Sequence, residues 1–158
     1  MDKVKTNSKE YDDPILYDKE NDEYIEDLSY LMKWASRSEG LPIIDLACGT
    51  GRATIPLVSL GYKLVGVDIH KGMLCEARKK SSKLELQIEW VEQDCTKFNL
   101  YVKSNLIFSV GKSFQHFLSN EEQDGLLSSV NKHLEMGGVF INDIYELIYV
   151  CKKVKNLT

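Results

Sequence analysis

Three aspartates lie at the ends of predicted β-strands, where a carboxylate can accept hydrogen bonds or attract a cationic group. Asp45 is in an apolar stretch typical of a buried strand, Asp68 closes the next such stretch, and Asp94 follows a third. In a parallel sheet these strand ends share one edge, and open α/β sheets bind their ligands at that edge. The three carboxylates are therefore predicted to face a single ligand.

Two glycines, Gly49 and Gly51, follow the first of these strands with one threonine between them. Glycine lets a backbone turn sharply and approach a ligand closely, and the first amides of the next helix are free to bind it. A dinucleotide-binding loop has a third glycine where this chain has Thr54. A pyrophosphate would gain nothing from the additional negative charge of Asp45. The carboxylate of Asp45 instead suits a ligand with an ammonium group. The structural alternative is a tight turn in which Asp45 caps a helix.

Asp68 and Asp94 match two further parts of such a ligand. Asp68 lies 17 positions after Gly51, close to the roughly 20 expected of an acid that binds ribose hydroxyls. Asp94 can accept a hydrogen bond from an adenine amino group while the Cys95 amide faces a ring nitrogen. The simpler alternatives are a helix cap for Asp68 and a solvated loop acid for Asp94. Together the three acids describe a ligand with an amino-acid end, a ribose and an adenine.

This arrangement resembles the class I S-adenosylmethionine-dependent methyltransferases of the small-molecule type. The resemblance covers roughly residues 11–144, and its strongest part is the stretch DLACGTG over 45–51. The stretch LEMGG over 134–138 is similar to the family's turn before strand five, with Met136 in place of proline. The resemblance implies that S-adenosylmethionine, with S-adenosylhomocysteine as product, is bound by Tyr17, Asp45, Ala47, Gly49, Gly51, Asp68, Ile69, Asp94, Cys95 and Gly111.

Two segments outside these motifs also have counterparts in the family. Residues 1–22 are similar to a lid segment in which an aromatic residue covers the cofactor, and residues 11–20 are predicted to be mobile. The segment after the fourth predicted strand would open onto the methyl group, with Gly111 under the sulfonium. Phe114 and Phe117 either face the ligands or belong to the core, and His116 is either a base or a structural residue. No catalytic residue and no metal ligand is assigned.

Strands and helices alternate along the chain, which predicts one α/β domain over residues 1–158 with a doubly wound, mostly parallel sheet. Strands are expected at 41–47, 62–67, 84–90, 106–110 and 139–144, and helices at 23–36, 52–60, 70–80 and 121–136. The resemblance implies seven strands, so the sheet is expected to stop after strand five and to lack the last two. Apolar residues at helical spacing predict a tail helix within 145–158 instead.

Composition excludes several classes of partner. The formal net charge of −4 leaves no basic surplus for nucleic acid. Four dispersed cysteines without a C-x-x-C pair favour reduced intracellular thiols over a zinc site or disulfides. The polar N-terminus and the lack of a long apolar run predict a cytoplasmic protein without a membrane segment. An uncovered strand five predicts a homodimer, and the alternative is a monomer whose tail hides that edge.

Three functions remain open from the sequence. The first is a methyltransferase with a small-molecule acceptor, and the second is a cofactor-binding relative whose catalysis is impaired because strands are missing. The third, a nicotinamide-dependent oxidoreductase, is disfavoured by Asp45 and Thr54. Methyl transfer is an in-line attack on an already activated group, so the protein mainly supplies alignment. Transfer is expected to be weak unless a partner chain completes the site.

Overall fold

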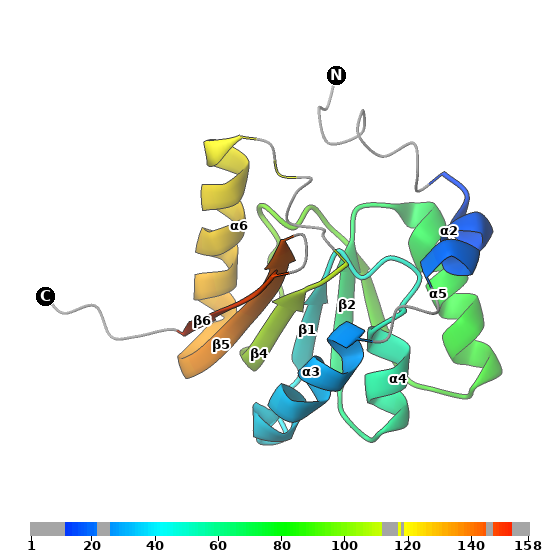
Figure 1. The fold of residues 1–158 in the computed structure, drawn as a ribbon, viewed down its shortest axis with the longest axis horizontal. Helices are drawn as coiled ribbons and strands as arrows, with labels where there is room; N and C mark the ends of the chain where they lie inside the picture. Colours follow the sequence, from blue (N-terminus) through cyan, green and yellow to red (C-terminus); the bar gives the residue numbers. More distant parts are fainter. Residues whose placement is uncertain (1–11, 22–25, 112–116, 118, 145–146, 153–158) are drawn as a thin grey trace, which may run out of the picture.

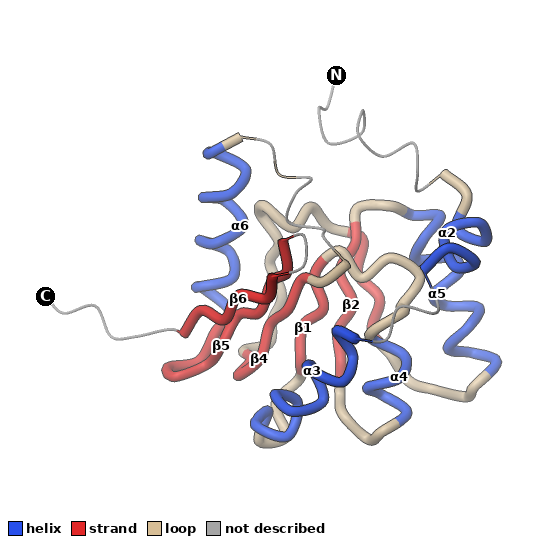
Figure 2. Tube along the Cα trace, in the orientation of Figure 1, coloured by secondary structure: helices blue, strands red, loops and turns tan. Residues whose placement is uncertain are grey.

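One β-sheet organises the computed structural model, which describes residues 12–21, 26–111, 117, 119–144 and 147–152 (Figures 1 and 2). The strand order is β3-β2-β1-β4-β5-β6. The strands are β1 (Ile43–Leu46), β2 (Leu64–Asp68), β3 (Glu89–Glu92), β4 (Ser104–Ser109), β5 (Leu134–Ile144) and β6 (Leu147–Lys152). The first five run parallel and β6 runs antiparallel to β5, which confirms the predicted mostly parallel sheet.

Helices lie on both faces of this sheet (Figure 1). Alternate strand residues point to opposite faces, so Ile43 packs with α3 and α4 whereas Ile44 packs with α6. α5 lies beside β2 and β3, and α2 lies against α5. The helices are α2 (Pro14–Asn21), α3 (Glu26–Ala35), the short 3₁₀ helix η2 (Ser36–Ser38), α4 (Thr54–Ser59), α5 (Lys71–Lys83) and α6 (Asn120–His133). This double winding is the predicted fold class.

The sequence explains why these elements form where they do. β1, β2 and most of β4 are buried on both faces, which is why their sequences are nearly continuous apolar runs. α6 begins with a capping box, in which the Ser119 hydroxyl accepts from the Glu122 amide at 3.1 Å and the Glu122 carboxylate accepts from the Ser119 amide at 2.9 Å. These local signals place strand ends and helix starts together at one end of the sheet.

The predicted tail helix is wrong, and the sheet does not stop at strand five. β6 pairs with β5 in the register Ile144↔Leu147 to Val139↔Lys152. Its sequence, LIYVCK, is rich in β-branched and aromatic residues, which favour strands. In a short apolar run the helical and strand periods overlap, so the spacing alone could not separate them. A strand beside β5 is therefore present where none was expected.

Two internal boundaries also differ from the predictions. α6 ends at His133, and the stretch predicted to finish it instead begins β5, with Gly137 at φ +81°. The third strand begins at Glu89 rather than at residue 84, because α5 continues to Lys83 and turns through Glu85 at φ +54°. Among the described helices, none combines the length and the apolar character that a membrane crossing requires.

Candidate functional site

The carboxyl edge of the sheet, meaning the end at which β1, β2, β4 and β5 finish, carries the predicted site. Between β1 and α4 runs a loop over residues 47–53, here called the glycine loop. The chain winds from β1 toward β2 in one direction and toward β4 in the other, so this loop lies at the topological switch point where doubly wound sheets bind ligands.

Asp45 is almost completely buried, with 2% of its surface exposed. Its Oδ2 accepts a hydrogen bond of 2.5 Å from the Thr54 hydroxyl at the start of α4. Burial raises the pKa of Asp45 to about 7, while the Thr54 hydrogen bond and the Arg52 guanidinium act in the opposite direction. The residue that replaces the third glycine of a dinucleotide loop therefore serves to hold this buried acid.

Asp68 ties the end of β2 to the glycine loop. It is 5% exposed, its Oδ2 accepts from the Gly49 amide at 2.8 Å, and its Oδ1 accepts from the His70 amide at 2.8 Å. Burial raises the pKa of Asp68, and the hydrogen bonds from His70 and Gly49 oppose that effect. The helix-cap alternative is thus partly correct, since one carboxylate oxygen holds the amide before α5. The Ile69 amide also hydrogen-bonds to this carboxylate, which can accept further hydrogen bonds because its two oxygens together offer about four lone-pair sites.

The two glycines of the loop have different reasons to be glycine. Both have positive φ, +57° at Gly49 and +84° at Gly51, a conformation that side chains disfavour. A Cβ at Gly51 would lie 2.6 Å from the Trp90 ring. A Cβ at Gly49 would lie 3.2 Å from the Met73 methyl carbon and 3.8 Å from the Tyr17 ring. Gly51 is thus required by packing against Trp90, and Gly49 stands under the predicted lid residue.

Arg52 joins the glycine loop to α3 and α2. Its guanidinium forms a two-point ion pair with the buried carboxylate of Asp27, at 2.6 and 3.1 Å. The Tyr17 side chain hydrogen-bonds to Arg52, and burial raises the pKa of Tyr17 while Arg52 lowers it. Arg52 also reaches Gly111, where an added Cβ would lie 3.3 Å from its guanidinium nitrogen. One buried cation therefore contacts the loop after β1, the loop after β4 and both preceding helices.

A second polar contact fastens α2 to the glycine loop. The Thr50 hydroxyl donates to the carboxylate of Asp18, and the Lys80 ammonium contacts that carboxylate at 3.0 Å and the Thr50 oxygen at 3.1 Å. The helix α2 itself is capped by Asp13, whose Oδ1 accepts from two amides of its first turn. The predicted lid segment thus contains a helix seated on the loop, and whether that helix is mobile stays a prediction.

The predicted adenine contacts lie at the ends of β1, β2 and β3. Ala47 is at φ +55° and its backbone hydrogen-bonds the Cys95 thiol, while Ile69 is partly exposed. Burial raises the pKa of the Cys95 thiol well above its ordinary range. Asp94 is partly exposed, and its Oδ1 accepts from the Thr96 amide at 2.9 Å and hydroxyl at 2.7 Å. The contact of Asp94 with an adenine amino group stays a prediction.

The ends of β4 and β5 contribute a further polar group. The Gly111 amide, at φ +75°, donates to Oδ2 of the buried Asp143 at 3.0 Å. Ser109, the last residue of β4, is 1% exposed, and its hydroxyl has no hydrogen-bond partner among the described residues. The register partner of Ser109 on β5 is the buried Asn142. A buried hydroxyl without a partner is uncommon in native proteins.

Several predicted residues of the acceptor side can be placed only in part. Phe117 is buried in the cluster that includes Phe98 and Val130, which favours its core assignment. Phe114, His116 and the lid residue Tyr11 lie outside the described residues. The described part of the chain contains no cluster of three histidine, cysteine or acidic side chains that could hold a metal ion.

Sequence reasoning missed the residues that join distant segments. Asp27, Lys80 and Asp143 come from α3, α5 and β5, and each contacts the site only through the tertiary fold. Lys80 stands in the last turn of α5, where a cation also suits the helix dipole, so its type and position do not point to the site. Trp90 lies close to Gly51 and Gly66, where an added Cβ would meet its ring at 2.6 and 2.5 Å.

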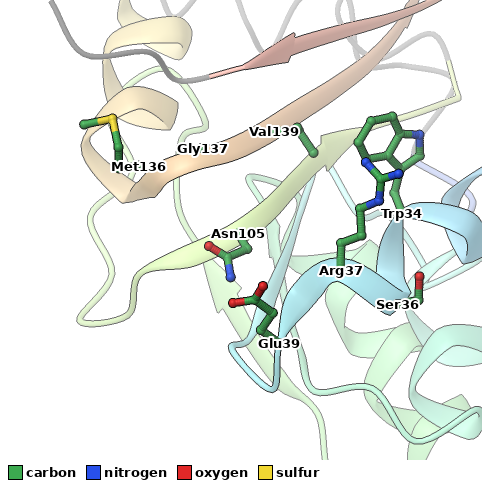
Figure 3. Close-up of a pocket in the computed structure, with 8 residues that line it drawn as sticks. All are labelled: Trp34, Ser36, Arg37, Glu39, Asn105, Met136, Gly137 and Val139. Atoms are coloured by element: carbon green, nitrogen blue, oxygen red, sulfur yellow. The ribbon is translucent and has the colours of Figure 1, made fainter.

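A cavity lies at the other end of the sheet, called here the amino edge, where β1, β4 and β5 begin (Figure 3). It has a volume of about 430 Å³. The Arg37 guanidinium lies 4.7 Å from the Trp34 ring centroid, and the Asn105 amide donates to the Ser38 carbonyl at 3.3 Å. None of the predicted site residues borders this cavity. It is therefore separate from the candidate site.

Comparison with known proteins connects this geometry to one family. The sequence profile of a family described as a methyltransferase domain matches residues 43–138. The cypemycin N-terminal methyltransferase of a Streptomyces species is 28% identical over 116 residues, which are 72% of this chain and 46% of that protein. The chain spans about half the length of the curated relatives it matches.

Solved structures of methyltransferases are also similar to this chain. A crystal structure of an S-adenosylmethionine-dependent methyltransferase from Clostridium acetobutylicum is 28% identical, with a TM-score of 0.72, and the match covers 82% of this chain and 55% of that one. The glycopeptide N-methyltransferase MtfA, in complex with S-adenosylmethionine, is 27% identical with a TM-score of 0.64. That match covers 73% of this chain and 48% of the other.

Proposed function

The chain belongs to the S-adenosylmethionine-dependent methyltransferase family, and from this premise we propose that its carboxyl edge binds S-adenosylmethionine for methyl transfer to a small-molecule acceptor. The observation that carries the proposal is the joining of Asp68 to the Gly49 amide at 2.8 Å. This hydrogen bond holds the carboxylate that would bind the ribose next to the backbone turn that would accommodate the amino-acid end of the cofactor.

The residues of the site fit the parts of the cofactor. The glycine loop and Asp45 would receive the amino-acid end, and Asp68 the ribose hydroxyls. Asp94, the Cys95 amide, Ala47 and Ile69 would surround the adenine. Tyr17 would cover the ligand above Gly49, and Gly111 would lie under the sulfonium. The buried Ser109 hydroxyl, which has no partner within the described part of the chain, supports a ligand at this edge, because an unsatisfied polar group costs free energy that a bound molecule can offset.

The bound cofactor supplies an activated methyl group, so this chain's residues mainly hold and align the reactants. The Arg52–Asp27 ion pair and the Asp143–Gly111 hydrogen bond fix the loops on either side of the reacting position. Tyr17 and α2 would cover the bound ligand and exclude water. No described residue is placed as a general base, and the acceptor would supply its own nucleophile.

An amine is the acceptor class that the relatives favour. Two of the relatives described above are named as N-methyltransferases. The chain spans about half the length of those proteins. We propose that methyl transfer by this chain alone is weak and that a partner chain completes the acceptor side. A cytoplasmic location stays a prediction.

The sheet offers a place for such a partner. Among the described strands β6 is an end of the sheet and pairs only with β5, so its outer backbone groups can pair with a second copy. The predicted homodimer is therefore proposed at β6 rather than at β5. Light scattering would give the mass, and a species at 18.1 kDa at high concentration would contradict the dimer.

Calorimetric titration with S-adenosylhomocysteine tests the proposed cofactor site. Asp68→Ala should weaken binding by about 1.5–3 kcal/mol, the scale of hydrogen bonds to a charged group. Glu39→Ala at the amino edge is the control and should bind like the parent. NAD should not bind to any of the three proteins. Equal affinity of the parent and the Asp68 variant would show that the ribose assignment is wrong.

A further inference from the structure

The segment between β3 and β4, residues 93–103, contains turns but no helix or strand, and is here called the β3–β4 loop. Two hydrogen bonds between Gln93 and Asn99 close it on itself. The Gln93 Nε2 donates to the Asn99 carbonyl at 3.2 Å, and the Gln93 Oε1 accepts from the Asn99 amide at 2.8 Å. Asp94 and Cys95, the residues predicted to contact adenine, lie inside the closed segment. Their positions therefore depend on what holds this loop.

Helix α6 holds the loop from one side. The Ser129 hydroxyl donates to the Thr96 carbonyl at 3.2 Å. A Cβ at Gly125 would lie 2.8 Å from the same carbonyl oxygen, so the loop backbone approaches the helix closely at a position without a side chain. Thr96 in turn donates to Asp94, through its amide at 2.9 Å and its hydroxyl at 2.7 Å. α6 is thus connected to Asp94 through one intermediate residue.

His133, the last residue of α6, makes a second connection to the loop. It is buried, its ring stacks on Phe98 with 4.4 Å between the ring centroids, and its Nε2 accepts from the Leu100 amide at 2.9 Å. Because a backbone amide can only donate, Nε2 carries no proton and the ring is neutral. The proton of the ring is therefore on Nδ1, which donates to the Ser129 carbonyl at 2.7 Å. The two hydrogen bonds fix both the tautomer and the orientation of the ring.

The contacts of His133 are linked to the predicted adenine contacts through Asn99. Phe98 and Leu100, which His133 contacts, flank Asn99, and Asn99 is bound to Gln93, the first residue of the loop. His133 itself stands where β5 begins, at the opposite end of the sheet from the predicted ligand. Any effect of His133 on ligand binding must therefore act through the loop.

We propose that His133 is a positioning residue for the adenine of the cofactor, because its hydrogen bond to the Leu100 amide holds the β3–β4 loop with Asp94 and the Cys95 amide in place. This inference rests on the proposed cofactor site. Without that hydrogen bond the partly buried Leu100 amide loses its acceptor, and the loop must move for the amide to find another partner. Such a movement changes recognition of the adenine edge and leaves the contacts of the ribose and the amino-acid end intact.

Two substitutions separate the hydrogen bond from the packing. His133→Gln provides a side-chain oxygen that can accept from the Leu100 amide, and it removes the ring. His133→Phe keeps a ring that can stack on Phe98, and it removes the acceptor. Val139→Ala is the control for a general loss of stability, because Val139 is buried in the cluster on the other face of the sheet.

Calorimetric titration of the full chain tests the proposal with two ligands, S-adenosylhomocysteine and S-inosylhomocysteine. The second ligand has an oxygen where adenine has its amino group, so the ratio of the two affinities measures recognition of the adenine edge. The parent and Val139→Ala should prefer S-adenosylhomocysteine by about tenfold, the scale of one hydrogen bond. His133→Phe should reduce the ratio to about threefold or less, and His133→Gln should restore most of it.

The outcomes distinguish this inference from the proposed function. An unchanged ratio in His133→Phe would overturn the positioning role, and so would a His133→Gln variant that behaves like His133→Phe. Equal binding of the two ligands by the parent would also overturn it, because the adenine amino group would then not be recognised. Binding of neither ligand by the parent would contradict the proposed function itself, and this inference with it.

Nitrogen NMR spectra of the parent test the hydrogen bond without any substitution. The chain has three histidines, and the ring of His133 should show a protonated Nδ1 and an unprotonated Nε2, both with and without S-adenosylhomocysteine. A proton on Nε2 would exclude the hydrogen bond from the Leu100 amide and would overturn the proposal.

Discussion

Charged side chains are buried at one end of the sheet and exposed at the other. At the carboxyl edge Asp45, Asp68 and Asp143 are buried, and hydroxyls or backbone amides hold them. At the amino edge the charged residues Arg37 and Glu39 are exposed, and Arg37 lies over the ring of Trp34 (Figure 3). Burying a carboxylate costs free energy that a hydroxyl or an amide only partly offsets.

That difference indicates which end of the molecule is built for function. A cavity is present at the amino edge, yet its charged groups remain in water and are not arranged toward a common point. At the carboxyl edge four segments that are far apart in sequence converge on the glycine loop, through Tyr17, Asp27, Asp68 and Lys80. Convergence of buried polar groups, rather than hollow volume, marks the candidate site.

The largest expected effect compares one glycine from each edge. Gly51 and Gly137 have similar backbone angles, φ +84° and +81°. A Cβ at Gly51 would meet Trp90 at 2.6 Å, and the Trp90 ring is held by Gly66 and by a bond to Ser81, whereas nothing lies within 4 Å of a Cβ at Gly137. Gly51→Ala should lower the free energy of unfolding by about 3–5 kcal/mol, and Gly137→Ala by about 1–2 kcal/mol.

Urea unfolding of both variants measures this difference. Since the backbone strain is matched, the additional destabilisation of Gly51→Ala reports the close contacts of the added Cβ with Trp90 and Ile55. Similar losses for the two glycines would contradict the packing role assigned to Gly51.

The second effect compares one acid from each edge and depends on pH. The carboxyl of Asp45 ionises near 3.8 in the unfolded chain and near 7 in the folded one, so between these values only the folded state holds the proton. Stability contributed by Asp45 is therefore present at low pH and lost as the pH rises through 7. Asp45→Asn should raise the free energy of unfolding at pH 8 by on the order of 2–4 kcal/mol.

The gain from Asp45→Asn should be smaller at pH 5, because the penalty for ionising the buried acid is then mostly absent. Unfolding curves at the two pH values give the comparison. Glu39→Gln at the amino edge is the control and should change stability by less than about 0.5 kcal/mol at both. An Asp45→Asn variant that is less stable than the parent at pH 8 would show that the charge of Asp45 is compensated in the folded protein.

The smallest effect separates two neighbouring lysines of α5. Lys80 reaches Asp18 and Thr50 at the carboxyl edge, with 26% of its side chain exposed, whereas Lys79 is 64% exposed and lies 3.6 Å from Glu76. Lys80→Met should weaken the packing of α2 on the glycine loop by about 1 kcal/mol, and Lys79→Met should weaken it by less than about 0.5 kcal/mol.

Hydrogen exchange of residues 12–21 measures directly how firmly α2 packs on the glycine loop. The Lys80 variant should exchange about fivefold faster than the parent, as about 1 kcal/mol implies. Addition of S-adenosylhomocysteine should slow exchange in the parent if α2 acts as a lid. Equal protection with and without the ligand would contradict the lid, and equal exchange in the two lysine variants would contradict the contact through Lys80.

Local sequence patterns were sufficient to predict the features that depend on only a few neighbouring residues. The doubly wound sheet followed from apolar runs alternating with amphipathic ones, and the strand-end acids and the glycine turn from their positions along the chain. The same patterns were ambiguous at the tail, where residues 147–152 form a strand although their spacing also fits a helix. A strand needs a partner, and the pairing of this one with β5 is a contact that no local pattern encodes.

What the sequence alone determined is therefore the order of the elements and the kind of cofactor they suit, because backbone turns and burial depend on neighbouring residue types. Only the tertiary structure decided which side chains meet at the site. Thr54 holds Asp45, Asp27 engages Arg52, and Asp143 holds Gly111. Except for the first, these contacts join residues more than twenty positions apart, and their geometry exists only once the sheet has brought the strand ends together. The positions of the loops around the site are set by those contacts.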